Sequence, residues 1–415
     1  MEHLKREDPR LADLIEKESR RIENTLDLIA AENHPPAPVL EVLGSILTIK
    51  TIEGYPGRRF HGGCRHADAV ERLAVERACR LFGAEHANVQ PHSGTSANLA
   101  VYFSVLETGD RILSMHLPHG GHLSHGHPAS ATSRCFRFAH YPVDRKTERI
   151  DYDTVRELAN DFRPRLLVAG ASAYPRLIDY AAMADIARGV GAYLMVDMAH
   201  IAGLVAAGVI PSPVEHSDFV TFTCYKTLMG GRGGVVLCRK RFAGDLDRAV
   251  FPGTQGTSPV SAIAAKAFIF HHATRAPFVE IQERTLSNAR TLSETLAGAG
   301  WRIVTGGTEN HQVLLDASTG GLTGADAEQR LESVGIITNR NAIPADAGVP
   351  GAASGLRLGT AAMAARGMGP EEAARIGVLV DEALRGADRE DVRGRVSSEI
   401  RSLCLSYPVY GGGPP

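Results

Sequence analysis

The sequence is poor in cysteine and in aromatic side chains, and it contains no long hydrophobic run. Scattered cysteines without a CxxC pair favour free thiols in a reducing cytoplasm over a disulfide framework. No apolar stretch approaches the roughly 20 residues of a membrane span, and no apolar segment of a secretory signal follows the charged N-terminus. We therefore expect a cytoplasmic protein without a membrane partner. The cysteines are Cys64, Cys79, Cys135, Cys224, Cys238 and Cys404.

An excess of charge of either sign is also missing. The 45 Lys and Arg residues nearly balance the 47 Asp and Glu residues, which leaves a formal net charge of −2. This balance gives no electrostatic reason to expect nucleic acid or an anionic membrane as a partner. What the sequence does have is 415 residues, 44% of them hydrophobic, and 43 glycines. That composition suits a large α/β enzyme of two domains with tight turns.

Strand-like and helix-like segments alternate through the middle of the chain. The run RLLVAGAS (165–172) is continuously apolar, as in a strand buried on both faces, and a helix (180–189) and two further strands (192–200 and 218–224) follow. This repetition predicts right-handed crossovers and a largely parallel sheet that binds ligands at the carboxyl ends of its strands. The polar residues at such ends are Ser172, Asp197, His200 and Lys226.

The N-terminus is predicted to form a helical arm, because Asp8-Pro9 is typical of a helix start. Apolar residues follow at helical spacing from Leu11 to Leu26, and this stripe needs a surface to rest on, in its own chain or in another subunit. One long helical stretch is expected from about 262 to 298. The expected division is an arm at 1–30, a large domain at 31–280, a small α+β domain at 281–405 and a flexible tail at 406–415.

Lys226 stands at the end of a strand and is followed by a glycine-rich turn. A buried lysine is costly unless its charge is used or removed, and an amine of lowered pKa can attack a carbonyl to form a Schiff base. The alternative is a lysine that extends its ammonium group to solvent. Lys226 lies, like Ser172, Asp197 and His200, at the carboxyl end of a predicted strand, and this shared position favours the functional interpretation.

The segment PHSGTS (91–96) opens a helix directly after a short strand. Ser93, Gly94 and Thr95 would present backbone N–H groups and hydroxyls at the positive end of that helix, which favours a phosphate group. No GK[ST] follows, so the pattern is not a P-loop. An ordinary serine N-cap is the alternative.

Two further segments have more than one interpretation. Five histidines lie within HLPHGGHLSHGH (116–127) and could bind a metal. Glycines and a proline break any regular spacing, however, and no carboxylate or cysteine is near in sequence, so we expect no metal and consider an imidazole lying flat on a cofactor ring instead. The glycine-rich loop EGYPGRRFHGG (53–63) carries Glu53 and His61 and is either functional or simply a solvated charged loop.

A phosphate cradle, a Schiff-base lysine, an acid at a strand end and a ring-covering imidazole together describe a pyridoxal-phosphate site. The chain closely resembles serine hydroxymethyltransferases, of the fold-type I (aspartate aminotransferase-like) superfamily. The resemblance runs from about Leu28 to Gly367 through EGYPGRR, LFGAEHANVQPHSG, HGGHLSHG, VAGASAYPR, YLMVDMAHIAGLVAAG, KTLMGGRGG and LRLGT. It implies an α/β fold in which a large domain holds a mostly parallel seven-stranded sheet and a smaller C-terminal domain is α+β.

The resemblance implies a role for each residue at the cofactor. The set is Ser93, Gly94 and Thr95 at the phosphate, His122 on the ring, Ser172 and His200 at its phenolic edge, Asp197 at the pyridine nitrogen, and Lys226 in the Schiff base. Arg357 would receive the α-carboxylate of an amino acid, and Glu53 would be the acid–base residue. The family builds this site between two subunits, so Glu53 and the Gly256-Thr257 turn would come from the partner of an obligate homodimer, which either stands alone or forms part of a tetramer.

Departures from the family pattern gather where the second substrate would bind. Leu117 is retained there, and Phe60 could still stack on a pterin. The departures are Ala31 for a serine, Thr51 for a tyrosine, Phe60-His61 for two tyrosines, Tyr225 for a histidine, Thr257-Ser258 for Gly-Pro, and Val349-Pro350-Gly351 for a folate-clasping Ser-Pro-Phe. The cofactor residues are spared, so we expect Cα–Cβ bond chemistry with a changed carbon donor or acceptor.

Several functions are compatible with this pattern. The first is an aldolase or transaldolase that converts serine, threonine or a relative to glycine and joins glycine to another aldehyde. The second is a tetrahydrofolate-dependent hydroxymethyltransferase for serine or for an α-methylserine, for which Ala31 would make room. A racemase or decarboxylase needs only the same cofactor, and a non-enzymatic pyridoxal-binding regulator would not need Glu53 and Arg357.

Overall fold

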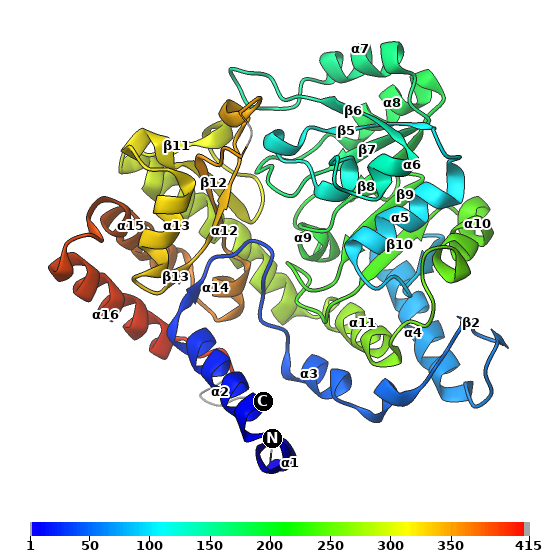
Figure 1. Cartoon of the computed structure of the whole chain (residues 1–415), viewed down its shortest axis with the longest axis horizontal. Helices are drawn as coiled ribbons and strands as arrows, with labels where there is room; N and C mark the ends of the chain where they lie inside the picture. The colour runs from blue at the N-terminus through cyan, green and yellow to red at the C-terminus, as the bar shows by residue number, and fades with distance from the viewer. Residues whose placement is uncertain (1, 350, 411–415) are drawn as a thin grey trace.

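Seven strands form one sheet in the order β4-β10-β9-β8-β7-β5-β6 (Figure 1). The computed structural model describes residues 2–349 and 351–410. Neighbouring strands are parallel except in the two pairs that β10 makes, which confirms the predicted α/β fold with a mostly parallel seven-stranded sheet. The strands are β4 (His86–Asn88), β5 (Arg111–Met115), β6 (Arg137–Tyr141), β7 (Leu166–Gly170), β8 (Tyr193–Asp197), β9 (Phe219–Thr223) and β10 (Gly234–Cys238).

Helices cover both faces of this sheet, because its central strands bury apolar side chains on both sides. In β7, Leu166 and Val168 pack in the same cluster as Val101 of α5, whereas Leu167 and Ala169 belong to the cluster on the opposite face. This arrangement explains the continuous apolar run in the sequence. The helices are α4 (Arg65–Phe82), α5 (Gly94–Val105), α6 (Thr132–Cys135), α7 (Tyr152–Phe162), α8 (Tyr180–Val190), α9 (Ala202–Ala206), α10 (Ala243–Arg248) and α11 (Val260–His272).

A second sheet of four antiparallel strands, in the order β11-β12-β15-β14, lies beside the first (Figure 1). Its helices bury a separate apolar cluster against it, and Leu26 and Leu28 from the N-terminal segment join that cluster. The elements are β1 (Leu26–Asp27), which pairs with β13 (Ile336–Ile337), β11 (Arg302–Ile303), β12 (Gln312–Asp316), β14 (Asn339–Asn341), β15 (Gly355–Gly359), α12 (Ala276–Gly298), α13 (Gly324–Glu332), α14 (Ala361–Ala365), α15 (Pro370–Gly386) and α16 (Glu390–Ser406). The domain boundaries expected from the sequence stay predictions.

The long helix expected from about 262 to 298 is wrong, since two helices occupy this stretch. α11 ends at His272 and α12 begins at Ala276. The backbone is extended at Arg275, the N-cap of α12, and Pro277 lies in the first turn of α12, where its missing N–H is tolerated. The apolar periodicity continues across the break, which is why the sequence pattern alone did not reveal it.

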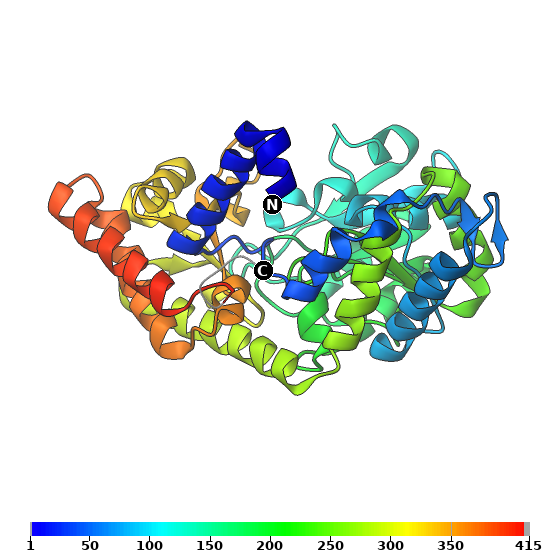
Figure 2. The ribbon, with the colours of Figure 1, turned by 90° about the horizontal axis from the view of Figure 1, so that it is seen from below.

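The N-terminal arm consists of α1 (Glu2–Glu7) and α2 (Pro9–Asn24), and the Asp8 carboxylate accepts the Leu11 N–H at 2.9 Å as the N-cap of α2. Figure 2 shows α2 near α16, yet Leu14 of its apolar stripe is 55% exposed. The chain by itself therefore does not cover this face of the arm. After the arm come α3 (Ala37–Leu43) and a hairpin of β2 (Gly54–Tyr55) and β3 (Arg58–Arg59).

The C-terminal tail was expected to be flexible from residue 406. Within its described part, the Tyr407 hydroxyl donates to Glu372 at 2.7 Å, and the Tyr410 hydroxyl donates to the Pro35 carbonyl at 3.1 Å. Residues 411–415 lie outside the described residues. In the part of the chain that the structure describes, none of the helices has both the length and the hydropathy needed to cross a membrane.

A close approach between α9 and the turn after β9 gives a test of the packing beneath the strand ends. A Cβ at Gly203 would lie 2.2 Å from the Thr227 carbonyl oxygen, whereas a Cβ at Gly189, in α8, would meet nothing within 4 Å. Gly203→Ala should therefore lower the free energy of unfolding by about 2 kcal/mol through overpacking. Gly189→Ala, the matched control, should raise it by about 0.5 kcal/mol. Urea denaturation measures both, and a Gly203→Ala protein as stable as the parent would contradict the packing described here.

Candidate functional site

A cavity opens at the carboxyl ends of the parallel strands, beside the N-terminus of α5. Residues that follow β5, β7, β8 and β9 line it together with the first turn of α5. The lining residues are Ser93, Gly94, Thr95, His122, Ala171, Ser172, Asp197, Ala199, His200, Thr223, Tyr225 and Lys226. All eight residues predicted from the sequence to contact the cofactor within one chain are among them.

Asp197 is the last residue of β8 and accepts several hydrogen bonds. The Ala199 N–H donates to Oδ1 at 3.0 Å, and Asn98 Nδ2 and His125 Nε2 approach Oδ2 at 2.9 and 3.0 Å. Burial alone would raise the pKa of Asp197, but the hydrogen bonds and charge of His125, aided by Asn98, hold it well below its usual range. The carboxylate is thus ionised at neutral pH and can attract a protonated base in the cavity.

Asn98 and His125 were not identified from the sequence as site residues. Asn98 lies on α5, and besides Asp197 it binds Thr221 of β9, whose hydroxyl donates to Asn98 Oδ1 at 2.6 Å. His125 belongs to the histidine-rich segment, but only its neighbour His122 was assigned a role. The available signal for Asn98 was an amide side chain four positions after Gly94, on the same face of the helix.

His122 also faces the cavity, and its orientation is fixed by Ser124. The Ser124 hydroxyl lies 2.7 Å from His122 Nδ1, and the Ser124 N–H donates to the same nitrogen at 3.2 Å. Nδ1 is therefore the acceptor, and burial lowers the pKa of His122 to about 4. A neutral imidazole can lie against an aromatic ring without adding charge.

The fold places a carboxylate beside two of the five histidines, which the sequence spacing did not anticipate. Donor atoms of His122, His125 and Asp197 all lie within 4.8 Å of one another. However, the amide nitrogen of Asn98 also points at Asp197 Oδ2, and it lies 3.4 Å from His125 Nε2. An N–H donor within the cluster opposes a cation, so the geometry favours a hydrogen-bond network over a metal site.

Lys226 lies three residues beyond the end of β9 and is only 8% exposed. Burial lowers the pKa of its amine to about 8, although the Asp197 carboxylate opposes part of this shift. Arg357 and Arg232 lower the pKa further. Lys226 is therefore a buried amine that is partly unprotonated near neutral pH, which is the state needed for attack on a carbonyl.

The N-terminus of α5 lines the cavity beside the end of β9. Ser93 caps the helix through its hydroxyl, which accepts the Ser96 N–H at 3.2 Å. The next N–H groups, of Gly94 and Thr95, have no acceptor inside an α-helix and can bind an anion. A Cβ at Gly94 would lie 2.7 Å from Thr223 Cγ2, so glycine is required for the helix to start this close to β9.

Arg357 of the second sheet contacts the wall of the cavity at Ser172. It lies on β15, donates from Nη1 to the Ser172 carbonyl at 2.7 Å and from Nε to Asn339 at 3.2 Å. Burial lowers the pKa of its guanidinium to about 10, so it stays charged at neutral pH. A cation supplied by the second sheet therefore stands next to the strand-end cavity, where an anionic substrate group could be bound.

His200 stacks on His311, which is a third residue that was not identified from the sequence. The ring centroids are 5.6 Å apart at an interplanar angle of 21°, and His311 Nε2 lies 3.1 Å from the Ala30 carbonyl. Burial lowers the pKa of both rings, that of His311 to about 3. The pair connects the cavity to β12 and to the segment after the N-terminal arm.

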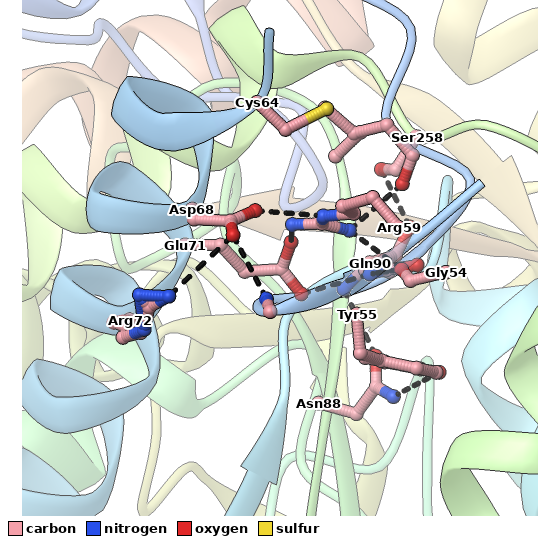
Figure 3. A network of polar contacts seen from close by, with 12 residues as sticks. Gly54, Tyr55, Arg59, Cys64, Asp68, Glu71, Arg72, Asn88, Gln90 and Ser258 are labelled. Carbon is pink, nitrogen blue, oxygen red and sulfur yellow. Dashed lines mark hydrogen bonds and ion pairs between the residues drawn. The ribbon is translucent and has the colours of Figure 1, made fainter. Parts of the chain in front are cut away.

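The loop that carries Glu53 is held by a buried arginine (Figure 3). Arg59 Nη1 donates to the carbonyls of Ile52 and Gly54, the two residues on either side of Glu53, and its Nε donates to Asp68 at 2.8 Å. Its Nη2 donates to Glu71, and its side chain is only 3% exposed. The interpretation of this loop as a simply solvated segment is therefore wrong at Arg59.

The remaining predicted residues do not line the cavity. Glu53 lies near Gly256 of its own chain, with 3.8 Å between Glu53 Oε1 and a Cβ placed on Gly256, and the Thr257 carbonyl lies 3.0 Å from His92 Nε2. Phe60 is 76% exposed and stacks obliquely on Phe251 at 5.8 Å. His61 and Leu117 are also exposed, as is Val349 of the predicted folate loop, whose Pro350 lies outside the described residues.

Comparison with known proteins agrees with this geometry. The family model described as "Serine hydroxymethyltransferase" matches residues 4–380. A curated relative, the serine hydroxymethyltransferase of Methanospirillum hungatei JF-1, is 49% identical over 410 residues, which is 99% of each chain. The resemblance inferred from the motifs is thereby confirmed. The chain belongs to the serine hydroxymethyltransferase family of fold-type I, pyridoxal-phosphate-dependent transferases.

Proposed function

We propose that the chain makes and breaks the Cα–Cβ bond of a β-hydroxy amino acid, with an aldehyde rather than a folate as the second substrate. The observation that supports the first part is that Lys226 and Asp197 line one cavity, and that Arg357 binds the carbonyl of Ser172 in the wall of the same cavity. The second part rests on the departures from the family pattern, of which Tyr225 lines that cavity and the other described ones lie outside it. An aldolase or transaldolase is the reaction type that this combination favours.

The residues of the cavity fit pyridoxal phosphate. The N–H groups of Gly94 and Thr95 suit its phosphate, the ionised Asp197 suits a protonated pyridine nitrogen, and the Lys226 amine suits its aldehyde. When bound, this cofactor supplies an electron sink for the carbanion formed at Cα. His200 Nδ1 has no hydrogen-bond partner among the described residues, so a buried polar atom is available at the cavity wall.

The protein side chains then divide the work of binding and proton movement. Arg357 would hold the α-carboxylate, and His122 would present a neutral imidazole to the cofactor. Asp197 keeps the pyridine nitrogen protonated because its own pKa is held low. Glu53 exchanges a proton with the β-hydroxyl when the bond to Cβ breaks.

The second-substrate end is proposed to accept an aldehyde because phenols of the family pattern are missing there. His61 and Phe60 replace two tyrosines, and both are exposed on the single chain. Losing a phenolic hydroxyl from a site built to hydrogen-bond a substrate weakens binding of that substrate strongly. A folate with many polar contacts should be affected more than a small aldehyde.

A folate-dependent hydroxymethyltransferase is the second candidate, and a specific feature favours it. The Phe60 ring packs near Phe251 at 5.8 Å and leaves an aromatic surface on the loop that carries Glu53. Such a surface could stack on a pterin. The relative that is 49% identical is also named a serine hydroxymethyltransferase.

We also propose that the active form is a homodimer in which Glu53 and the Gly256-Thr257 turn serve the partner's cavity. Neither lines the cavity of its own chain. Large apolar side chains are exposed on the segment that follows α3, including Ile46 at 77% and Ile49 at 75%. A second copy would cover them, together with Leu14 of the arm. We further propose that the protein is cytoplasmic, and that its chain divides into an arm (1–30), a large domain (31–280), a small domain (281–405) and a tail (406–415).

The lowered pKa of Lys226 predicts how the apo-protein takes up its cofactor. Below pH 8 the unprotonated fraction of an amine with a pKa of about 8 rises tenfold per pH unit, so the rate of covalent capture of pyridoxal phosphate should rise with pH and level off above 8. Stopped-flow absorbance measures this rate. Lys226→Ala is the control and should form no borohydride-reducible link. If the capture rate of the parent protein keeps rising to pH 10, the pKa of Lys226 is not lowered and the prediction is wrong.

The nature of the second substrate is tested by product analysis. The purified protein is incubated with L-serine or L-threonine, with and without tetrahydrofolate, and with an added aromatic or sugar-derived aldehyde. We expect glycine from threonine, or a new β-hydroxy amino acid, without folate. Glycine formed from serine only when folate is present would refute the aldehyde proposal. The double variant Phe60→Tyr, His61→Tyr restores the family pair and should raise any folate-dependent rate.

A further inference from the structure

Lys266 is a second buried lysine, and none of the roles above uses it. It lies on α11, is 1% exposed, and takes part in no ion pair among the described residues. Its ammonium instead donates to three backbone carbonyls: Val89 at 2.6 Å, Pro91 at 3.1 Å and Gly234 at 2.9 Å. All three donors of the ammonium group are thus used, and burial lowers its pKa to about 8.

The three carbonyls belong to the two segments that support the phosphate cradle. Val89 and Pro91 lie on the connection from β4 to α5, two to four residues before Ser93. Gly234 begins β10, and its N–H donates to the Pro91 carbonyl at 2.9 Å. A Cβ on Gly234 would lie 2.2 Å from the Ser93 carbonyl, so β10 packs directly against the cradle. Lys266 therefore fixes the chain that leads into the first turn of α5.

The chemistry of the contact explains why a charged residue occupies this place. Carbonyl oxygens that pointed into the cradle would repel an anion, and Lys266 draws those of Pro91 and Gly234 toward itself. A buried cation is costly and is seldom found where an apolar side chain would pack as well. Gly233 also makes room for it, since a Cβ there would lie 2.4 Å from Lys266 Cε.

We infer that Lys266 is a positioning residue for the phosphate group: it orients the backbone before Ser93 so that N–H groups, and not carbonyls, face the anion. It acts through the cradle and does not touch the substrate. The inference rests on pyridoxal phosphate as the cofactor, but not on the identity of the second substrate. Binding measurements alone therefore test it, and the product analysis above can fail without affecting it.

The test compares two ligands that differ only in the phosphate group. Dissociation constants of the apo-protein for pyridoxal phosphate and for pyridoxal are measured by fluorescence titration, with the thermal midpoint of each apo-protein recorded alongside. Lys266→Met should weaken binding of pyridoxal phosphate by about tenfold or more, because misplaced N–H donors no longer reach the anion. It should change the affinity for pyridoxal by less than about twofold.

Two further variants separate this role from a general loss of structure. Arg77→Met is the matched control. Arg77 lies on α4, and its Nη1 donates to the carbonyl of Ala267, the neighbour of Lys266 on α11, at 2.7 Å. This variant should leave both affinities unchanged. Lys266→Gln retains neutral donors and serves if Lys266→Met does not fold, and it should again weaken binding of the phosphate form selectively. An equal loss for both ligands, or no loss for pyridoxal phosphate with only a lowered thermal midpoint, would overturn the inference.

Discussion

The burial of opposite charges at neighbouring strand ends is the constraint on which this site depends. Asp197 ends β8, and Lys226 follows β9, which pairs with β8 in parallel. Neither charge is tolerated inside a protein without partners. Asp197 obtains its partners from α5 and from the histidine-rich segment, through Asn98 and His125. The helix layer, the loops after β5 and the sheet must therefore assemble together for the site to exist.

The same constraint explains how distant segments are joined. Arg357 of the second sheet is held by the Ser172 carbonyl, next to β7, and His311 of the same sheet stacks on His200. Arg59 binds the peptide groups on both sides of Glu53 and ties that loop to α4. Each contact places a charge or a ring at the edge of the sheet. Together they leave Lys226 and Asp197 in the cavity of one chain and Glu53 outside that cavity.

The sequence predicted those parts of the molecule whose determinants are local. The alternating strands, the helix start at Asp8 and the cradle at Ser93 depend on residues close together in the chain. Asn98 was missed because its role arises only when α5 packs beside Asp197 at the end of β8. His311, the residue before β12, was missed because its role arises only when it stacks on His200 in the loop after β8. The break between α11 and α12 was missed because the apolar periodicity runs across it. The substitutions at Phe60 and His61 were visible in the sequence, but their chemical consequence depends on a second substrate and a second subunit.

The most direct test of a site shared between two copies is complementation between inactive subunits. Lys226→Ala and Glu53→Gln proteins, each inactive alone, are unfolded together, refolded and assayed for glycine formation. If Glu53 serves the partner's cavity, each mixed dimer contains one site with both groups intact, and random mixing should restore about a quarter of the parental activity. If Glu53 serves its own chain, every site lacks one of the two groups and the mixture stays inactive, which would contradict the account.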